Sequence, residues 1–317
     1  MASLVKKGRA EAAFPARKKG YTPGDIVFNI INYTVFILLT ILCVYPFYYL
    51  FINTISSNQL SANGAINWYP QQIQWKNYIA VFKLEGLPNA FFISVMRTVI
   101  GTALTVFASA YLGFMFTQER MWKRKFWYRF VIVTMYFNAG LIPGFIINYN
   151  LGLTNNFWVY VLPAIVQPFN IILVKTYIES TPKSLQEAAS IDGAGVLKIF
   201  FRVVLPISMP ILATIAIFSA VGQWNSFQDT LIYVTDQKLY SLQYLLYSYI
   251  NSANSLASLI MSSPGLSGSA IADLATRQTP TSIRMTVSII VIIPILLVYP
   301  FFQRYFVKGI MIGAVKG

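Results

Sequence analysis

Amide, carboxylate and guanidinium side chains occur inside long apolar stretches of this 317-residue sequence. Groups of this kind donate and accept hydrogen bonds, and they are costly when they face lipid without a partner. Together with one tryptophan, they are the candidates for lining a polar path: Arg97, Asn138, Gln167, Asn170, Gln223, Trp224, Asn225 and Asp229. Their chemistry is reversible hydrogen bonding. The alternative is that they bond to one another across helices or to a partner chain.

The densest group lies near the end of the apolar stretch from Pro206 to Val234. If this stretch forms one continuous helix, Asn225 and Asp229 share a face because they are four residues apart. Trp224 and Gln228 then form an adjacent stripe on the same helix. This spacing predicts one polar face at the end of the stretch.

Arg97 lies about a third of the way into the apolar stretch from Ala90 to Phe116. A cation at this depth costs several kcal/mol unless it faces water or a partner. Snorkelling or a hydrogen bond to a backbone carbonyl would satisfy the guanidinium without a ligand. A contact with the hydroxyls or the carboxylate of a bound molecule is the alternative.

The stretch from Met135 to Pro143 contains Asn138, Gly140 and Pro143, which loosen a spanning helix and free backbone groups. Such irregularity is acceptable in a membrane only against protein or a water-filled path. Helix packing through Gly140 is the alternative to a role in such a path.

The sequence offers little material for covalent or metal chemistry. It contains no His and a single Cys, Cys43, which we expect to be a small buried side chain. Metal sites built on His or Cys clusters, Cys–His nucleophiles and imidazole general bases are therefore excluded within this chain. No Gly-x-x-x-x-Gly-Lys-Ser/Thr loop is present, so the chain has no phosphate-binding loop of that type. We expect no catalytic residue, no metal site and no cofactor bound by this chain.

The composition predicts a membrane protein. Hydrophobic residues make up 56% of the sequence and charged residues only 11%. An ordinary soluble domain has roughly 25% charged residues. A net charge of +14 would suit nucleic-acid binding if a folded domain carried a basic face, but the cations lie between apolar stretches. We therefore expect a lipid bilayer around the chain and no nucleic-acid partner.

Six stretches reach the length of about 20 residues that a membrane-spanning helix needs. They are Ile26–Phe51, Ala90–Phe116, Phe126–Ile147, Phe157–Ile178, Pro206–Val234 and Ile283–Phe306. Of the 24 Lys and Arg residues, 18 lie in the N-terminal tail, after the second stretch, around the end of the fourth, or at the C-terminus. Because cytoplasmic segments are enriched in Lys and Arg, both termini are expected in the cytoplasm. The predicted fold is an all-α, six-helix integral membrane protein, with a basic cytoplasmic tail at 1–25 and a transmembrane domain at 26–317.

Two long connections lie on the opposite side of the membrane in this topology. The connection from Asn53 to Pro88 carries Trp68 and Trp75, which favour the outer membrane interface. Residues 235–281 form a second connection, in which Tyr240–Ile250 and Leu256–Met261 could form short surface helices. Each connection either anchors and links the spans or contacts an extracytoplasmic partner.

A segment of mixed polarity, Glu187 to Pro206, follows the fourth stretch on the cytoplasmic side. Ser180-Thr-Pro182 predicts a helix start just before it, because Ser or Thr caps free N–H groups and Pro is tolerated in the first turn. Asp192-Gly193 predicts a turn, since Gly accepts a positive φ and Asp tolerates local backbone bonding. A second amphipathic run from Phe200 to Leu205 then returns to the membrane.

This segment resembles the cytoplasmic coupling motif of the permease subunits of bacterial ABC importers. The resemblance rests on Glu187-Ala-Ala, a Gly four residues after the last Ala, and a terminal Val-x-Leu205-Pro206. Trp224-Asn225 and the tail from Lys308 to Gly317 are similar to the carbohydrate-uptake branch. Met135–Pro143, Ile283–Met285 and Tyr299–Phe301 are similar to a subgroup associated with complex oligosaccharides. The resemblance covers nearly all of residues 26–317 and implies the fold of a type I ABC importer permease.

The resemblance implies that the coupling helices, at about 180–204, meet an ATPase. The residues to which it assigns this coupling are Glu187, Ala188, Ala189, Asp192, Gly193, Leu205 and Pro206. Ala188 and Ala189 would allow close approach and Gly193 would permit the turn, whereas a structural turn explains Asp192 equally well. The residues Gly313, Ala314, Val315, Lys316 and Gly317 resemble a tail that reaches the interface between two ATPase subunits. A frayed C-terminus is the alternative for that tail.

The resemblance further implies a multi-pass permease of the bacterial inner membrane that imports an oligosaccharide by alternating access. Its partners would be a second homologous permease, two ATPase subunits that bind ATP and Mg, and an extracytoplasmic solute-binding protein. Amide and carboxylate hydrogen bonds with an aromatic face commonly hold sugars, which fits the polar candidates. A permease for peptide or phosphate shares the coupling motif, so only the sugar-branch resemblance argues against it. A secondary transporter is disfavoured because the apolar stretches hold few carboxylates.

Overall fold

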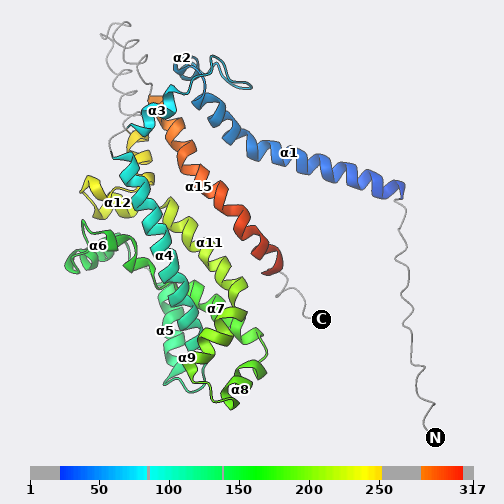
Figure 1. Cartoon of the computed structure of the whole chain (residues 1–317), viewed down its shortest axis with the longest axis vertical. Helices are drawn as coiled ribbons and strands as arrows, with labels where there is room; N and C mark the ends of the chain where they lie inside the picture. The colour runs from blue at the N-terminus through cyan, green and yellow to red at the C-terminus, as the bar shows by residue number, and fades with distance from the viewer. Residues whose placement is uncertain (1–21, 84–85, 138, 252–279, 310–317) are drawn as a thin grey trace. The chain divides into compact units, whose positions relative to one another are not determined.

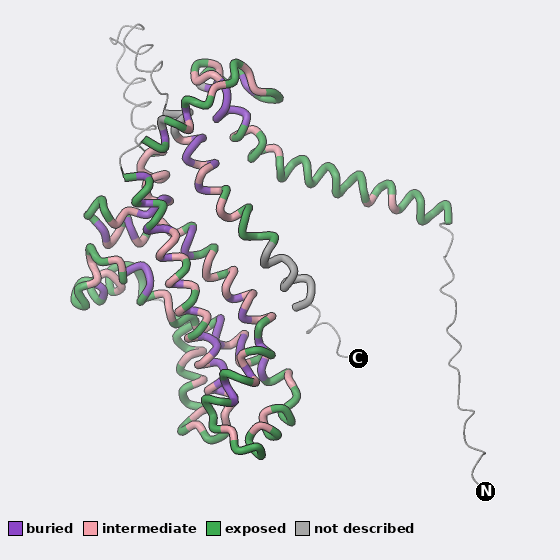
Figure 2. The backbone as a smooth tube through the Cα atoms, viewed as in Figure 1, coloured by how far each residue is buried: buried purple, intermediate pink, exposed green. Residues whose placement is uncertain are grey.

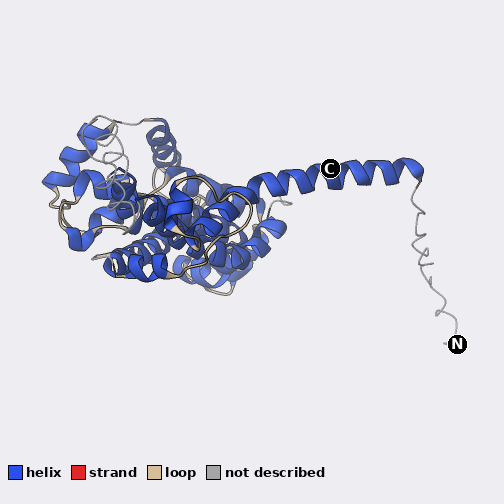
Figure 3. Cartoon of the chain, turned by 90° about the horizontal axis from the view of Figure 1, so that it is seen from above, coloured by secondary structure: helices blue, strands red, loops and turns tan. Residues whose placement is uncertain are grey.

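The computed structural model describes residues 22–83, 86–137, 139–251 and 280–309 (Figure 1). Every regular element within those ranges is a helix, and none is a strand (Figure 3). The chain divides into two compact units, Met1–Tyr48 and Tyr49–Gly317. The all-helical architecture expected from the sequence is confirmed for these residues.

Most of α1, which runs from Pro23 to Thr54, belongs to the first unit. Thr22 and Asp25 form a capping box at its start. The Thr22 N–H donates to the Asp25 carboxylate at 2.9 Å, and the Asp25 N–H donates to Thr22 Oγ1 at 3.3 Å. Most of this helix is exposed along the first unit (Figure 2). Its exposed residues are largely apolar, and Cys43 is exposed as well. The predicted helix at Ile26–Phe51 is confirmed, whereas a buried Cys43 is wrong, because no side chain of the described residues covers it.

The central helix of the second unit is α4, from Leu87 to Met115. It packs against α7 (Pro168–Ser180) and α11 (Met209–Asn225), as Figure 1 shows. Gly113 permits the close approach to α7, since a Cβ at this position would lie 2.8 Å from Val174 Cβ. The buried core at this crossing consists of Ala110, Phe114, Val174, Ile178, Ile199, Phe200, Val204, Leu212 and Ile215.

The third predicted span is interrupted. Two helices occupy it, α5 (Arg124–Tyr136) and α6 (Leu141–Asn150). Gly140 stands at the start of α6 with a φ of +87°, a conformation that residues with a Cβ rarely adopt. The expectation that this stretch does not form one regular helix is confirmed.

The fourth and fifth predicted spans are bent where they begin. The 3₁₀ segments η1 (Phe157–Tyr160) and η2 (Leu162–Ala164) meet α7 at 45°. The short elements α9 (Val196–Ile199), η3 (Phe200–Val204) and α10 (Leu205–Ile207) meet α11 at 79°. Of these, η3 is a single π-helical turn, a feature that often occurs at functional sites.

The fifth span also ends earlier than expected. Helix α11 stops at Asn225, and a separate helix, α12 (Gln228–Tyr233), begins after a two-residue break. Ser226 in this break has an extended backbone, with φ −74° and ψ 126°. The expectation of one continuous helix from Pro206 to Val234 is therefore wrong.

By length and apolar character, two of the described helices can each cross a membrane, α1 and α4. The number rises to five if each of three bent pairs forms one span. Helix α15 (Pro280–Gly309) occupies the sixth predicted stretch, and its apolar section from Arg284 to Pro300 is shorter. The six-span topology therefore stays a prediction.

The long connections pack against α15. Helices α2 (Asn58–Ala62) and α3 (Lys76–Phe82) both contact it, while Trp68 and Trp75 remain exposed. Residues 242–251 form a helix close to the predicted Tyr240–Ile250. Its first residue, Leu242, is fully buried in a cluster with Trp224 and Val287, whereas residues 243–251 are partly or fully exposed. The second predicted helix, Leu256–Met261, lies outside the described residues.

Candidate functional site

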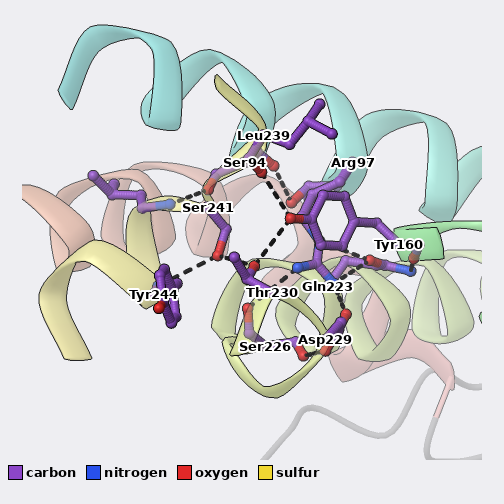
Figure 4. A network of polar contacts seen from close by, with 12 residues as sticks. Ser94, Arg97, Tyr160, Gln223, Ser226, Asp229, Thr230, Leu239, Ser241 and Tyr244 are labelled. Carbon is purple, nitrogen blue, oxygen red and sulfur yellow. Dashed lines mark hydrogen bonds and ion pairs between the residues drawn. The ribbon is translucent and has the colours of Figure 1, made fainter. Parts of the chain in front are cut away.

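Arg97 on α4 is buried, with only 1% of its surface exposed. Its Nε and Nη2 groups donate to Gln223 Oε1 at 3.2 and 3.1 Å, and its Nη1 group donates to the Ser226 carbonyl at 3.3 Å. Its Nη2 group also forms an ion pair with the Asp229 carboxylate (Figure 4). The ring of Tyr160 lies against the guanidinium, 4.4 Å from its Cζ. The chain's own groups therefore satisfy this buried cation.

Asp229 reaches Arg97 because the helix breaks after Asn225. The carbonyl of Ser226 accepts a hydrogen bond from Arg97, and its hydroxyl donates to the Asp229 carboxylate. Asp229 lies in the first turn of α12, where free backbone N–H groups favour a carboxylate. Asn225 is exposed instead, and its Oδ1 accepts from Gln243 Nε2 at 3.2 Å. The expected face shared by Asn225 and Asp229 is wrong, because the break gives the two side chains different partners.

Tyr160 connects the ion pair to a second set of hydrogen bonds. Its hydroxyl donates to the Leu239 carbonyl at 2.7 Å and shares a hydrogen bond with Thr230 Oγ1 at 3.1 Å. Its carbonyl accepts from Gln223 Nε2 at 3.1 Å. Thr230 Oγ1 in turn shares a hydrogen bond with Ser241 Oγ at 2.9 Å. The network joins α4, η1, α11, α12 and the segment after Leu239 (Figure 4), so it fixes the helix break from several sides.

A polar cavity of about 360 Å³ adjoins this network. It is lined by Arg97, Tyr160, Ala164, Gln167, Asn170, Phe218, Ser219, Gly222, Gln223, Ser226 and Asp229. Five of the eight residues expected to line a polar path therefore meet at one cavity, although they lie on four separate parts of the chain. We take this polar cavity as the candidate site.

Some polar groups of the polar cavity have no hydrogen-bond partner within the described residues. Asn170 is 7% exposed, and its side-chain amide has no hydrogen-bond partner among the described residues. The Ser219 hydroxyl likewise has none within this part of the chain. Gln167 donates from Nε2 to the Ala164 carbonyl at 3.2 Å, which leaves its own side-chain oxygen free for another donor. Because unpaired buried amides are costly, these groups are suited to binding water or a ligand.

Trp224 lies apart from the polar cavity. It is 6% exposed, and its indole Nε1–H donates to the Val291 carbonyl of α15 at 3.1 Å. Its ring also packs edge-on against Phe91, with centroids 6.1 Å apart. A separate cavity of about 230 Å³ between α4, α11 and α15 includes Trp224 in its lining. The last predicted path residue, Asn138, lies outside the described residues.

Three polar residues that line the cavity had not been expected from the sequence: Tyr160, Ser219 and Ser226. Tyr160 and Ser219 lie in apolar stretches, where no local pattern distinguishes them from ordinary packing residues. Asn225-Ser226 does carry a signal, because both residue types favour turns and local backbone hydrogen bonds. That signal is compatible with a break after Asn225 but does not by itself place Asp229 beside Arg97.

The turn expected in the coupling segment is present. Helix α8 runs from Ser184 to Ile191, and Gly193 follows with a φ of +74°, as predicted. The Gly193 N–H donates to the Ser190 carbonyl at 3.1 Å, and the Ala194 N–H donates to the Ala189 carbonyl at 3.0 Å. These two bonds form a Schellman motif, which terminates α8 in a defined direction.

The predicted start of that helix is wrong. The hydroxyls of Ser180 and Thr181 donate to the Tyr177 and Ile178 carbonyls, each at 2.7 Å. Both side chains thus satisfy the end of α7 and do not cap the helix that follows. Helix α8 begins at Ser184 without a side-chain cap.

The coupling residues differ in exposure. Glu187 and Ala188 are exposed on α8, whereas Ala189 packs against the buried core cluster around Val204. Ile191 at the end of α8 is 86% exposed, which is unusual for an isoleucine. Glu187, Ala188 and Ile191 therefore form the open surface of α8.

The remaining coupling residues are less prominent. The Asp192 carboxylate makes no hydrogen bond within the described ranges, although its N–H donates to the Ala188 carbonyl at 3.0 Å. Leu205 is half-buried and Pro206 exposed in α10. The predicted ATPase-contacting tail, Gly313 to Gly317, lies outside the described residues.

Comparison with known proteins identifies the family. Residues 106–312 match the family described as the binding-protein-dependent transport system inner membrane component. The chain belongs to this family. The family consists of membrane components of ABC transporters, so the permease is a transport subunit and not an enzyme.

Two relatives from Bacillus subtilis (strain 168) match the permease over most of its length. The polygalacturonan/rhamnogalacturonan transport system permease protein YtcP is 31% identical, covering 92% of this chain and 99% of its own. Protein LplC is 30% identical, with coverages of 93% and 97%. Both matches extend over nearly the whole length of this chain and of the relative.

Solved structures agree with the permease fold. A chain from the crystal structure of a bacterial ABC transporter involved in the import of the acidic polysaccharide alginate superposes with a TM-score of 0.78. It is 27% identical, and the match covers 90% of this chain and 99% of that chain. A chain of an alginate transporter in complex with a pentasaccharide-bound periplasmic protein has a TM-score of 0.53 at 14% identity, a likeness of fold alone.

Proposed function

We propose that the permease imports an oligosaccharide, derived from a polysaccharide, across the bacterial inner membrane. The observation that carries this proposal is the polar cavity, where the unpaired Asn170 amide and Ser219 hydroxyl lie among apolar helices. Such groups suit ligands with many hydroxyls, since each hydroxyl both donates and accepts hydrogen bonds. Similarity to a polygalacturonan/rhamnogalacturonan permease and to an alginate transporter supports a saccharide over a peptide or phosphate.

The proposed topology has six spans and both termini in the cytoplasm. It is supported by the two continuous spanning helices, the three bent pairs and α15. The concentration of Lys and Arg in alternate connections supports the orientation. Residues 1–25 then form a cytoplasmic tail, 26–317 the transmembrane domain and 235–281 an extracytoplasmic connection.

The proposed partners are a second homologous permease, two ATPase subunits and an extracytoplasmic solute-binding protein. The open surface of α8 docks on an ATPase subunit, because Glu187 and Ile191 offer it a charge and an apolar side chain. ATP and Mg bind in the ATPase, since the permease sequence has no phosphate-binding loop of the Gly-Lys-Ser/Thr type. The C-terminal residues Gly313 to Gly317 are proposed to contact the ATPase pair.

The proposal is tested with the whole purified complex. Oligosaccharides, peptides and phosphate are presented on the binding protein, and the rate of ATP hydrolysis is measured for each. We expect stimulation by an oligosaccharide and none by a peptide or phosphate. Stimulation by a peptide alone would show that the cargo assignment is wrong. Stoichiometric ATP binding by the isolated permease would contradict the proposal that ATP binds only in the ATPase subunits.

A further inference from the structure

The charges at the polar cavity are already paired. Arg97 and Asp229 are the two charged side chains among its lining residues, and they form an ion pair with each other. Arg97 makes further hydrogen bonds to Gln223 and to the Ser226 carbonyl, and Asp229 accepts one from the Ser226 hydroxyl. The polar cavity thus contains both a cation and an anion, yet it carries no net charge from the residues that line it.

The groups at the polar cavity that have no partner in the described part of the chain are uncharged. They are the Asn170 amide, the Ser219 hydroxyl and the side-chain oxygen of Gln167. An amide presents donors and an acceptor side by side, so it can hold a hydroxyl that both accepts and donates. A carboxylate only accepts hydrogen bonds, and it would leave the free acceptor of Gln167 unpaired.

We propose that the polar cavity binds an uncharged, hydroxyl-bearing face of the cargo, and that Asp229 keeps Arg97 from binding a cargo carboxylate. This inference rests on the proposed import of an oligosaccharide and adds which part of the sugar the polar cavity recognises. The assignment matters for acidic cargo, since the similar proteins include a polygalacturonan/rhamnogalacturonan permease and a transporter of the acidic polysaccharide alginate. Any uronate carboxylate of the cargo is recognised outside this cavity.

Electrostatics supports this assignment. A carboxylate that approached Arg97 would also approach Asp229, and like charges repel strongly in surroundings that hold little water. To reach the guanidinium it would have to displace Asp229, which leaves a buried carboxylate without its partner. A neutral hydroxyl meets neither obstacle. Asp229 is therefore a specificity-determining residue that acts by neutralising Arg97.

The test compares two probes of equal length, a short oligogalacturonide and its carboxyl-reduced, neutral counterpart. Each is loaded on the binding protein, and its uptake by the whole complex in proteoliposomes is measured. The quantity compared among variants is the ratio of uronate to neutral uptake, because the preference of the binding protein cancels from such a comparison. Assembly of the complex is checked for every variant by size-exclusion chromatography.

Asp229→Asn frees the positive charge of Arg97, so we expect the uronate-to-neutral ratio to rise about tenfold, equivalent to about 1.4 kcal/mol. The double variant Arg97→Gln with Asp229→Asn removes both charges and should return the ratio to the wild-type value. Asn170→Ala should lower the uptake of both probes by the same factor. The double variant and Asn170→Ala keep the proposal testable if Asp229→Asn fails to assemble.

Two outcomes would overturn the inference while leaving the proposed function in place. The first is an unchanged ratio in an assembled Asp229→Asn complex. The second is a selective loss of uronate uptake in the double variant, which would show that Arg97 binds the carboxylate in the wild type. A wild-type complex that imports neither probe overturns the proposed function for this class of saccharide and the inference with it.

Discussion

Gly101 on α4 faces the side-chain amide of Gln223 on α11, and a Cβ at Gly101 would lie 2.7 Å from Gln223 Nε2. That amide cannot easily move, since its Oε1 accepts from Arg97 and its Nε2 donates to the Tyr160 carbonyl. The missing side chain at position 101 thus gives Gln223 the space to join Arg97 to Tyr160. The contact between α4 and α11 and the polar network depend on the same glycine.

Gly101→Ala is expected to lower the free energy of unfolding by about 1–3 kcal/mol, the usual range for overpacking. The thermal unfolding of the detergent-purified complex measures this change. Gly222→Ala is the matched control, because a Cβ at Gly222 meets no atom within 4 Å. Equal effects of the two substitutions would contradict the role given to Gly101.

Gly193→Val is expected to uncouple transport while membrane insertion remains normal. Its φ of +74° is strained for a β-branched residue, by about 1–3 kcal/mol, so the turn after α8 changes direction. The measurements are uptake and cargo-stimulated ATP hydrolysis. Gly195→Val serves as the control, because Gly195 has a φ of −67° and open space around it. Normal coupling in Gly193→Val would show that the turn at Gly193 is not required for coupling.

Glu187→Lys reverses the charge on the open surface of α8 and is expected to weaken ATPase docking. We predict reduced co-purification of the ATPase subunits and reduced stimulation of ATP hydrolysis by cargo. Glu119→Lys is the control, since Glu119 is an exposed carboxylate outside α8 that pairs weakly with Lys183 at 3.6 Å. If both charge reversals have the same effect, the docking is not specific to α8.

Trp224 is expected to act through packing. Trp224→Ala should lower the free energy of unfolding by about 3–5 kcal/mol, the range for truncating a buried aromatic residue. Trp224→Phe retains a ring beside Phe91 but loses the hydrogen bond to the Val291 carbonyl, so a loss of about 1 kcal/mol is expected. A stable, assembled Trp224→Ala complex with defective uptake would instead show that Trp224 lines the cargo path, as the sequence predicted.

Local signals in the sequence predicted the helical class and the coupling turn. Gly193 is an example, because its positive φ follows from its residue type and its position after a short helix. The third span was expected to be irregular for a similar reason, since Gly140 and Pro143 are local helix breakers. These predictions depend only on residues that are neighbours in the sequence.

The partners of Arg97 could not be predicted in the same way. Asp229 was expected on the same face as Asn225 because the stretch from Pro206 to Val234 was interpreted as one continuous helix, and the turn-favouring pair Asn225-Ser226 is only a weak local signal against that. The break at Ser226 is stabilised by Arg97, which is more than a hundred residues earlier in the chain. The position of Trp224 likewise depends on α15, so its burial follows from long-range packing.

The central claim is that the polar cavity lies on the path of an imported oligosaccharide. The most direct measurement is uptake of a labelled oligosaccharide, delivered by the binding protein, into proteoliposomes that contain the whole complex. We predict uptake that requires ATP and that falls about tenfold in Asn170→Ala, because the amide loses its hydrogen bonds to the cargo. Full uptake in an assembled Asn170→Ala complex would contradict the account.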